Sequence, residues 1–224
     1  MYSKGILYPI ATPIGNLEDI TLRAIRILGE VDFILAEDTR VTLRLLNHLK
    51  IKKHLVSLNR INERGRIYST IEELEHGKNI ALVSDSGTPL LSDPGRILIE
   101  AAVEKNIAVI PIPGPSAVTG IIQASRLIYN SFIFLGFLPR KKSHKKKLFD
   151  QFSERTLPII IFESPFRILA TLKELHELLG DREITIGREM TKMHEEYIHM
   201  TIQDAIHEFE NRQKILGEFT VIVS

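Results

Sequence analysis

The sequence contains no cysteine, which excludes disulfide bonds, thiolate metal sites and a cysteine nucleophile. Its eight histidines are scattered along the chain, so we expect no metal site. No apolar run approaches the roughly 20 residues that span a bilayer, and the N-terminus enters a short strand-like run instead of a signal peptide. We therefore expect a soluble, cytoplasmic protein without a membrane partner.

Several common site motifs are also missing. The chain has no GxGxxG, no GxxxxGK, no HExxH and no GxSxG. These patterns belong to dinucleotide-binding folds, P-loop enzymes, zinc proteases and α/β-hydrolases, respectively. A ligand site must therefore be sought in other loops.

Positive charge is concentrated in one segment. The formal net charge is +1 at pH 7, yet six cations fall between residues 140 and 147. They are Arg140, Lys141, Lys142, Lys145, Lys146 and Lys147. A basic segment on an otherwise acidic chain indicates a local contact with a polyanion, although a solvated loop explains the run equally well at this point.

Hydropathy patterning indicates an α/β fold. Short apolar runs alternate with helical patterns in the first half of the chain, as βα units require. The expected strands are Ile6–Ala11, Phe33–Ala36, Ile80–Val83 and Ala108–Ile112, and the expected helices are Thr21–Leu28, Thr39–Leu49, Arg66–Glu75 and Arg96–Lys105. Such continuous apolar strands are typical of a parallel sheet that helices cover on both faces.

The pattern restarts after the proline-rich segment 113–115, so we expect two α/β domains, residues 1–114 and 115–224. The expected helices of the second domain are Ser116–Ala124, Lys145–Phe152 and Pro165–Leu179, and its expected strands are Phe132–Leu138, Pro158–Glu163, Ile184–Gly187, Tyr197–Thr201 and Phe219–Val223. The last strands lack long crossovers, which favours a mixed, partly antiparallel sheet.

Three turns rich in glycine and proline follow expected strands, at Ala11–Asn16, Ser84–Gly95 and Pro111–Ala117. Ligands of open α/β sheets bind beyond the carboxyl ends of the strands, so these turns are expected to converge on one crevice. Polar side chains such as Asp85 and Asp93 would supply hydrogen-bonding groups there. The residues alone predict a ligand crevice but no particular ligand.

A series of longer motifs carries a family resemblance. In chain order they are ATPIGNLEDIT, AEDTR, VSDSGTPLLSDPG, IPGPSA, FLGFLPRK, FESPFR and GREMTKMHEE. Together they closely resemble the tetrapyrrole methylase superfamily, and within it the branch that methylates the 2′-oxygen of a cytidine ribose in small-subunit (16S) ribosomal RNA. The resemblance spans essentially the whole chain.

The resemblance implies a class III S-adenosylmethionine-dependent methyltransferase, usually a homodimer. Its fold has two α/β lobes, with a parallel sheet in the first, a mixed sheet in the second and the cofactor in the cleft between them. The cofactor-binding residues that it implies are Pro13, Asp85, Gly87, Thr88, Leu91, Ser116, Ala117, Phe162, Met190 and Thr220. Thr88 stands where many relatives have aspartate, so Asp85 could supply the carboxylate instead.

Methyl transfer to a ribose hydroxyl requires a held hydroxyl, excluded water and a group that assists loss of its proton. The catalytic candidates are Asp38, Arg40 and Glu163, and the candidates for RNA binding are Asn59, Arg140, Lys141, Lys142, Lys145, Lys146, Arg167 and Arg188. A structural ion pair or a helix cap is the alternative for the charged residues of AEDTR, FESPFR and GREM. We expect the RNA to be bound within the assembled 30S particle.

Two other functions remain open on the sequence. One is a small-molecule methylase that acts on a corrin-type tetrapyrrole, and the other is a non-catalytic RNA-binding or ribosome-assembly protein. The basic run and the motifs AEDTR and FESPFR favour the RNA methyltransferase. Many relatives also continue beyond the point that corresponds to the strand EFTVIVS.

Overall fold

A computed structural model describes residues 4–128, 130–151 and 157–224. The chain divides into two compact units, Met1–Ser116 and Ala117–Ser224. The domain limits expected from the sequence, with a cofactor cleft between the domains, stay a prediction. No helix in the described ranges is both long enough and apolar enough to cross a membrane.

The first unit is built on a five-stranded sheet in which every neighbouring pair of strands is parallel. The strand order is β3-β2-β4-β1-β5, and the strands are β1 (Ile6–Ile10), β2 (Phe33–Ala36), β3 (His54–Ser57), β4 (Ile80–Val83) and β5 (Ala108–Val109). All four residues of the central strand β4 are buried, as its uninterrupted apolar sequence predicts.

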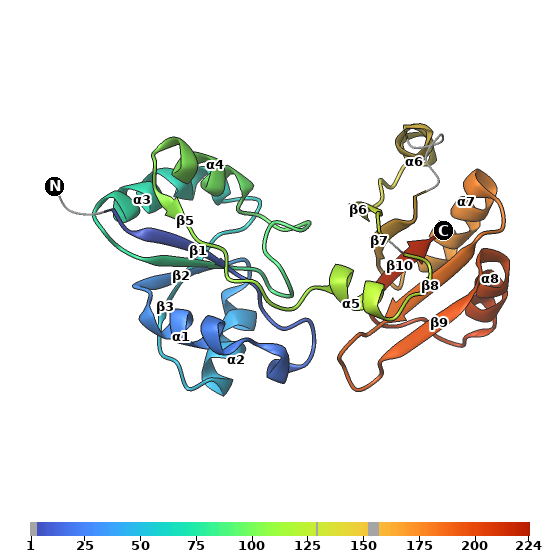
Figure 1. Ribbon diagram of the computed structural model, residues 1–224, viewed down its shortest axis with the longest axis horizontal. Helices are drawn as coiled ribbons and strands as arrows, with labels where there is room; N and C mark the ends of the chain where they lie inside the picture. Colours follow the sequence, from blue (N-terminus) through green and yellow to red (C-terminus); the bar gives the residue numbers. More distant parts are fainter. Residues whose placement is uncertain (1–3, 129, 152–156) are drawn as a thin grey trace. The chain divides into compact units, whose positions relative to one another are not determined.

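Helices cover both faces of this sheet (Figure 1). They are α1 (Leu22–Glu30), α2 (Thr39–His48), α3 (Glu63–Glu75) and α4 (Arg96–Glu104), with a short 3-10 turn, η1, at Leu17–Asp19. Side chains alternate between the faces of a strand. Ile34 and Ala81 therefore pack with α1 and α2, whereas Leu35 and Leu82 pack with α3 and α4.

The second unit has a mixed five-stranded sheet, which confirms the expected fold class. The strand order is β6-β7-β10-β8-β9, and the strands are β6 (Ile133–Phe137), β7 (Ile159–Glu163), β8 (Glu183–Arg188), β9 (Glu196–Thr201) and β10 (Phe219–Val223). Only the β6–β7 pair is parallel. The helices are α5 (Ala117–Gln123), α6 (Lys142–Asp150), α7 (Ile168–Leu179) and α8 (Ile202–Asn211).

The two faces of the second sheet have different partners. Val221 and Ile186 belong to a core cluster shared with α7 and α8. Alternation turns Thr220 and its cross-strand neighbours Phe162 and Gly187 toward the opposite face. Helix α5 lies against that face, since Ile121 is 3.3 Å from the position that a Cβ on Gly187 would occupy.

The structure also corrects several expected elements. The sequence analysis did not predict strand β3 or helix α8. Strand β5 is shorter than expected, and Ile112 pairs with Ile10 in an isolated β-bridge beyond its end. Helix α7 begins three residues later than expected because the Ser164 carbonyl first accepts a turn hydrogen bond from Arg167. Helix α6 begins at Lys142, and the expected end at Phe152 lies outside the described residues.

Gly95→Ala should destabilise the first unit. Gly95 has a φ of +116°, and an added Cβ would lie 2.6 Å from Leu82 Cδ2. Backbone strain and overlap together should lower the free energy of unfolding by about 1–3 kcal/mol. Gly65→Ala is the matched control: Gly65 lies in α3 with nothing within 4 Å of an added Cβ, and this change should stabilise by about 0.5–1 kcal/mol. Urea unfolding measures both, and equal stabilities would contradict this turn geometry.

Candidate functional site

Backbone hydrogen bonds join the three glycine- and proline-rich turns of the first unit. The N–H of Thr12 donates to the Gly87 carbonyl at 2.9 Å, and the N–H of Gly87 donates back to Thr12 at 3.0 Å. Ala11 donates to the Ile112 carbonyl at 3.2 Å. The Thr88 hydroxyl donates to the Pro115 carbonyl at 3.3 Å, which links the second turn to the third. The turns therefore lie together at the carboxyl edge of the sheet.

Gly87 is required by this arrangement. Its φ is +78°, a backbone conformation that residues other than glycine rarely adopt, and an added Cβ would lie 3.2 Å from Ile14 Cγ2. The main chain of the second turn thus approaches the first turn closely. The Thr12 hydroxyl adds a further contact by donating to the Ser84 carbonyl at 3.1 Å.

A pocket of about 240 Å³ lies between α2 and the turns that follow β1 and β4. Pro13, Leu17, Val41 and Leu45 form apolar parts of its lining. Its polar lining includes Thr42, whose side-chain oxygen is buried and has no hydrogen-bond partner among the described residues. Strands β2, β4 and β1 are neighbours in the sheet, which is why segments distant in sequence meet here.

Four acidic residues gather near the carboxyl ends of β2 and β4: Glu37 and Asp38 follow β2, Asp85 follows β4, and Asp93 is close enough to interact with the charges of Glu37 and Asp85. Asp85 Oδ1 accepts the Asp38 N–H at 2.9 Å. Burial raises the pKa of Glu37 and of Asp85. Burial, with the nearby charge of Glu37, raises the pKa of Asp93 to about 6. Part of this acidic cluster therefore exchanges protons near neutral pH.

Asp38 and Arg40 form a helix cap and an ion pair. Asp38 Oδ1 accepts the Arg40 N–H at 2.8 Å at the start of α2, and the Arg40 guanidinium donates to both carboxylate oxygens. Hydrogen bonds from the Arg40 side chain and backbone lower the pKa of Asp38 to about 2. Asp38 is consequently ionised throughout the neutral range and is a weak proton acceptor.

Glu163, the third catalytic candidate, is buried in the second unit. It accepts hydrogen bonds from the Thr171 hydroxyl at 2.7 Å and from the Ser164 N–H at 2.8 Å. Arg167 lies 3.2 Å from it and also donates to the Leu138 carbonyl at 2.8 Å. Both side chains thus tie the end of β7 to neighbouring segments, so we retain neither Glu163 as a catalytic residue nor Arg167 as an RNA ligand.

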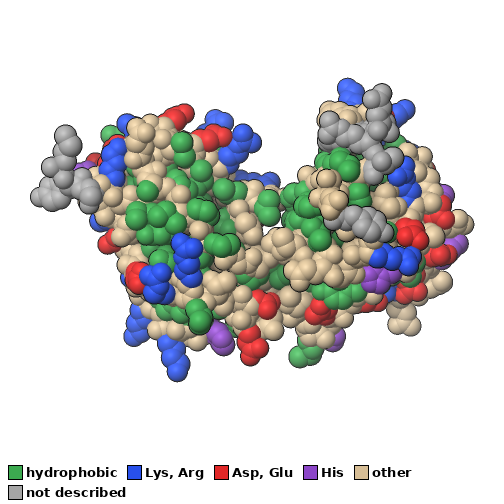
Figure 2. Space-filling view, in the orientation of Figure 1, with side chains coloured by type: hydrophobic (Ala, Val, Ile, Leu, Met, Phe, Trp, Pro, Cys, Tyr) green, Lys and Arg blue, Asp and Glu red, His purple; other side chains and the backbone are tan. Residues whose placement is uncertain are grey.

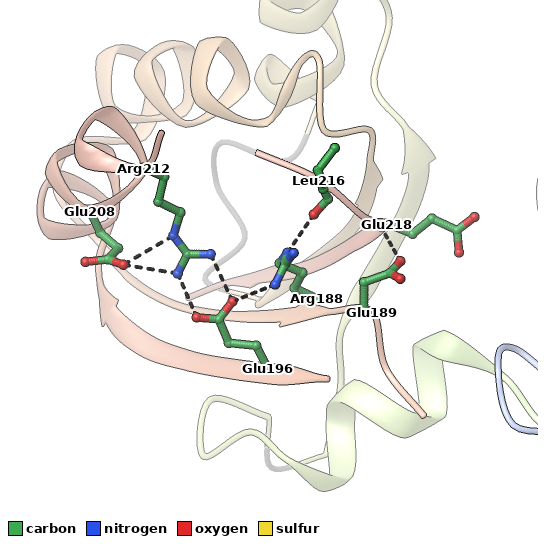
Figure 3. A network of polar contacts seen from close by, with 7 residues as sticks. All are labelled: Arg188, Glu189, Glu196, Glu208, Arg212, Leu216 and Glu218. Carbon is green, nitrogen blue, oxygen red and sulfur yellow. Dashed lines mark hydrogen bonds and ion pairs between the residues drawn. The ribbon is translucent and has the colours of Figure 1, made fainter. Parts of the chain in front are cut away.

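Arg188 belongs to a polar network beside β9 and α8 (Figure 3). Its guanidinium donates to the Leu216 carbonyl at 2.6 Å and lies 3.3 Å from Glu196. Arg212 pairs with the same Glu196 at 2.6 Å and with Glu208 at 3.1 Å. A guanidinium that is held in this way is a structural link, so we also leave Arg188 out of the proposed RNA contacts.

The cofactor candidates of the second unit lie close together. Thr220 of β10 is paired across the sheet with Phe162 on one side and Gly187 on the other. Met190 packs over Gly187, with its sulfur 2.6 Å from the position of an added Cβ. Ala117 begins α5, the helix against this face. These elements bring Phe162, Met190 and Thr220 into one neighbourhood.

The basic run is divided by the helix that it forms. Lys145 is only 4% exposed and its ammonium pairs with Glu174 of α7, while Lys142 pairs with Glu177 one turn away. Lys141 and Lys146 are exposed, as is Arg140, and Figure 2 shows blue Lys and Arg side chains flanking α6. We therefore leave Lys145 out of the proposed RNA contacts, because its ammonium is buried and paired with Glu174.

Asn59 has a local role in the turn after β3. Its side-chain oxygen accepts the N–H groups of Ile61 and Asn62 at 3.0 and 3.1 Å, and its amide donates to the Ser57 hydroxyl at 3.3 Å. Its polar groups therefore shape the start of α3, and its predicted RNA contact has no support in this geometry.

The sequence analysis did not select some residues that lie at the first-unit site. Glu37, Thr42 and Arg44 were not selected, although each lies within six residues of Asp38. Thr42 follows Asp38 by four positions, so one turn of helix places it on the same face of α2. The four-residue spacing from Asp38 could therefore have identified Thr42 as a site residue.

The first unit has the arrangement of open α/β proteins, in which ligands bind to the turns beyond the carboxyl ends of parallel strands. The model of the tetrapyrrole (corrin/porphyrin) methylases matches residues 7–206. The chain belongs to this family, and the resemblance drawn from its motifs is confirmed.

Curated relatives cover nearly all of the chain. The chain is 48% identical over 220 residues to "Ribosomal RNA small subunit methyltransferase I" of Thermotoga maritima, covering 98% of each protein. It is 46% identical to the protein of that name from Halalkalibacterium halodurans, covering 98% of this chain and 76% of the relative.

Solved structures share the fold at low sequence identity. The methyltransferase CobJ has a TM-score of 0.73 at 17% identity, covering 99% of this chain and 94% of that one. A uroporphyrin III C-methyl transferase from Thermus thermophilus has a TM-score of 0.67 at 16% identity, covering 97% of each chain. These likenesses support the two-unit fold class alone.

Proposed function

We propose that this protein transfers the methyl group of S-adenosylmethionine to the 2′-oxygen of a cytidine ribose in small-subunit ribosomal RNA. The observation that carries the proposal is near-full-length identity of 42–48% to relatives named as ribosomal RNA small subunit methyltransferase I. The corrin-type methylase is less favoured, because the solved tetrapyrrole methylases are only 15–17% identical.

The residues present fit such a cofactor. Its ammonium and ribose hydroxyls require hydrogen-bond acceptors, its sulfonium is stabilised by nearby oxygen atoms, and its carboxylate and adenine require donors and a flat apolar contact. In the first unit, the close backbone turn at Gly87 with Thr88, Leu91 and Ser116 is proposed to contribute. We do not retain Pro13 and Asp85 as cofactor contacts, because both line the pocket beside α2. In the second, Ala117, Phe162, Met190 and Thr220 are proposed to contribute. When bound, the cofactor supplies a methyl group already attached to a good leaving group.

The protein's own part is to position the ribose, exclude water and accept a proton. We propose Asp93 as the proton acceptor in place of Asp38 and Glu163. Its pKa of about 6 suits a base that works near neutral pH, whereas Asp38, with a pKa of about 2, is too weak. Glu37 contributes by its nearby negative charge, which helps to raise the pKa of Asp93.

We further propose that the protein binds its RNA substrate within the 30S particle in the cytoplasm and that it acts as a homodimer. Both parts rest on the family resemblance. Light scattering of the purified protein tests the second part, and a monomeric mass at micromolar concentration would contradict it.

The function is tested by mapping 2′-O-methylation in 16S RNA from a strain that lacks this protein. Purified wild-type protein and S-adenosylmethionine should restore one missing methyl group on a cytidine in isolated small subunits. Gly87→Val should abolish this activity and weaken cofactor binding at least tenfold, because the side chain collides with Ile14 in a turn with positive φ. Wild-type protein that binds no cofactor in calorimetry would instead favour a non-catalytic assembly role.

Asp93→Asn should lower kcat roughly 10²–10⁴-fold, because the amide cannot accept the proton. The wild-type kcat should rise as pH increases through about 6 and then level off, since the deprotonated carboxylate is the active form. The variant should lose this inflection while its cofactor affinity stays unchanged. A variant with the wild-type pH profile would remove Asp93 from this role.

The exposed half of α6 should contribute to RNA affinity. Charge reversal by Lys141→Glu with Lys146→Glu should weaken binding to small subunits at least tenfold and reduce the slope of log K against log salt by about two. Arg64→Glu with Arg66→Glu, on exposed positions of α3, is the matched control for net charge. Equal losses in both pairs would indicate that overall charge, and not this helix, determines binding.

A further inference from the structure

The pocket beside α2 also has polar groups in its lining. Thr42 is 3% exposed, and its side-chain oxygen has no hydrogen-bond partner among the described residues. A buried hydroxyl without a partner costs about 1–3 kcal/mol. A ligand that supplies the missing hydrogen bond would recover that cost, so Thr42 points to an occupant with polar edge atoms.

Asp85 supplies a second polar group in the lining of this pocket. One of its oxygens accepts the Asp38 N–H at 2.9 Å, which fixes the carboxylate in place. The carboxylate makes no other hydrogen bond within the described part of the chain. Asp85 therefore presents a further acceptor for a donor group on a ligand.

The size and walls of the pocket restrict the occupant. Its volume of about 240 Å³ is below the roughly 300–1,000 Å³ of sites that enclose a drug-sized ligand. Pro13, Leu17, Val41 and Leu45 provide apolar surfaces on which a flat ring can lie. Such a pocket suits one small planar ring with a polar edge.

We propose that this pocket receives the cytosine base of the target nucleotide, an inference that rests on the proposed function. Cytosine presents an N4 amino donor beside the acceptors N3 and O2. The Asp85 carboxylate accepts from N4, and the Thr42 hydroxyl donates to N3 or O2. Unstacked bases of single-stranded RNA are read on their Watson–Crick edge in this manner, as are bases in the pockets of enzymes that modify them.

The same groups discriminate against uracil. Uracil has the acceptor O4 in place of the N4 amino group, so its O4 would face the Asp85 carboxylate without a proton between them. Arg44, which is exposed and also lines the pocket, can contact the phosphate of the same nucleotide. Together these residues assign base selection to the first unit.

The test compares small subunits that carry cytidine or uridine at the mapped methylation site. Wild-type protein should prefer cytidine in kcat/KM by roughly 10- to 100-fold. Asp85→Asn should lower this preference at least tenfold, because its oxygen can still accept from Asp38 while its amide donates to O4 of uracil. Thr42→Val should lower kcat/KM for the cytidine substrate about tenfold, and Thr42→Ser should restore it. Cofactor affinity should stay within about twofold in all variants.

Glu37→Gln is the matched control, since it removes a neighbouring negative charge outside the pocket lining. It should keep the wild-type preference for cytidine. Unchanged selectivity in Asp85→Asn, or a loss of cofactor affinity in Thr42→Val and Thr42→Ser, would overturn the base pocket while leaving the proposed function intact. Wild-type protein that methylates neither subunit would overturn the proposed function and this inference with it.

Discussion

Two reciprocal hydrogen bonds between Thr12 and Gly87 determine the geometry of the first-unit site. Strands β1 and β4 are parallel neighbours, so the chain leaves the sheet at the same edge after both of them. The bridge prevents the two turns from separating, and the contact from Thr12 to the Ser84 carbonyl reinforces it. The turns that carry Thr12, Pro13, Ser84 and Asp85 into the pocket lining are therefore held together by main-chain hydrogen bonds.

That rigid edge also explains how neighbouring acids differ. Asp38 lies at the N-terminus of α2, where helix N–H groups and Arg40 stabilise its charge and lower its pKa. Glu37, Asp85 and Asp93 are more buried, and burial raises the pKa of each, with the charges of Glu37 and Asp85 adding to the effect at Asp93. The start of α2 thus lowers the pKa of one carboxyl group, whereas burial raises the pKa of its neighbours. Such a difference in environment gives similar side chains different roles.

The sequence predicted the parts of the fold that depend on local pattern. Continuous apolar runs located β2 and β4, and the rule for strand ends located the turns that meet at Thr12 and Gly87. Strand β3 was missed because it lies at the sheet edge with His54 exposed, which weakens its apolar signal. The partners of Arg188 could not be predicted, since Leu216 is 28 residues away and the contact depends on tertiary packing.

The basic run shows why a count of charges does not define a binding surface. Lys142 and Lys145 are three residues apart on α6 and meet Glu177 and Glu174, which are three residues apart in the reverse direction on α7. This register requires the two helices to run antiparallel along the contact. Two cations of the run therefore pair with α7, Lys145 in a buried position, and the opposite face of α6 is the better placed to attract a polyanion. The helical period, and not the number of lysines, sets the charge that the RNA would meet.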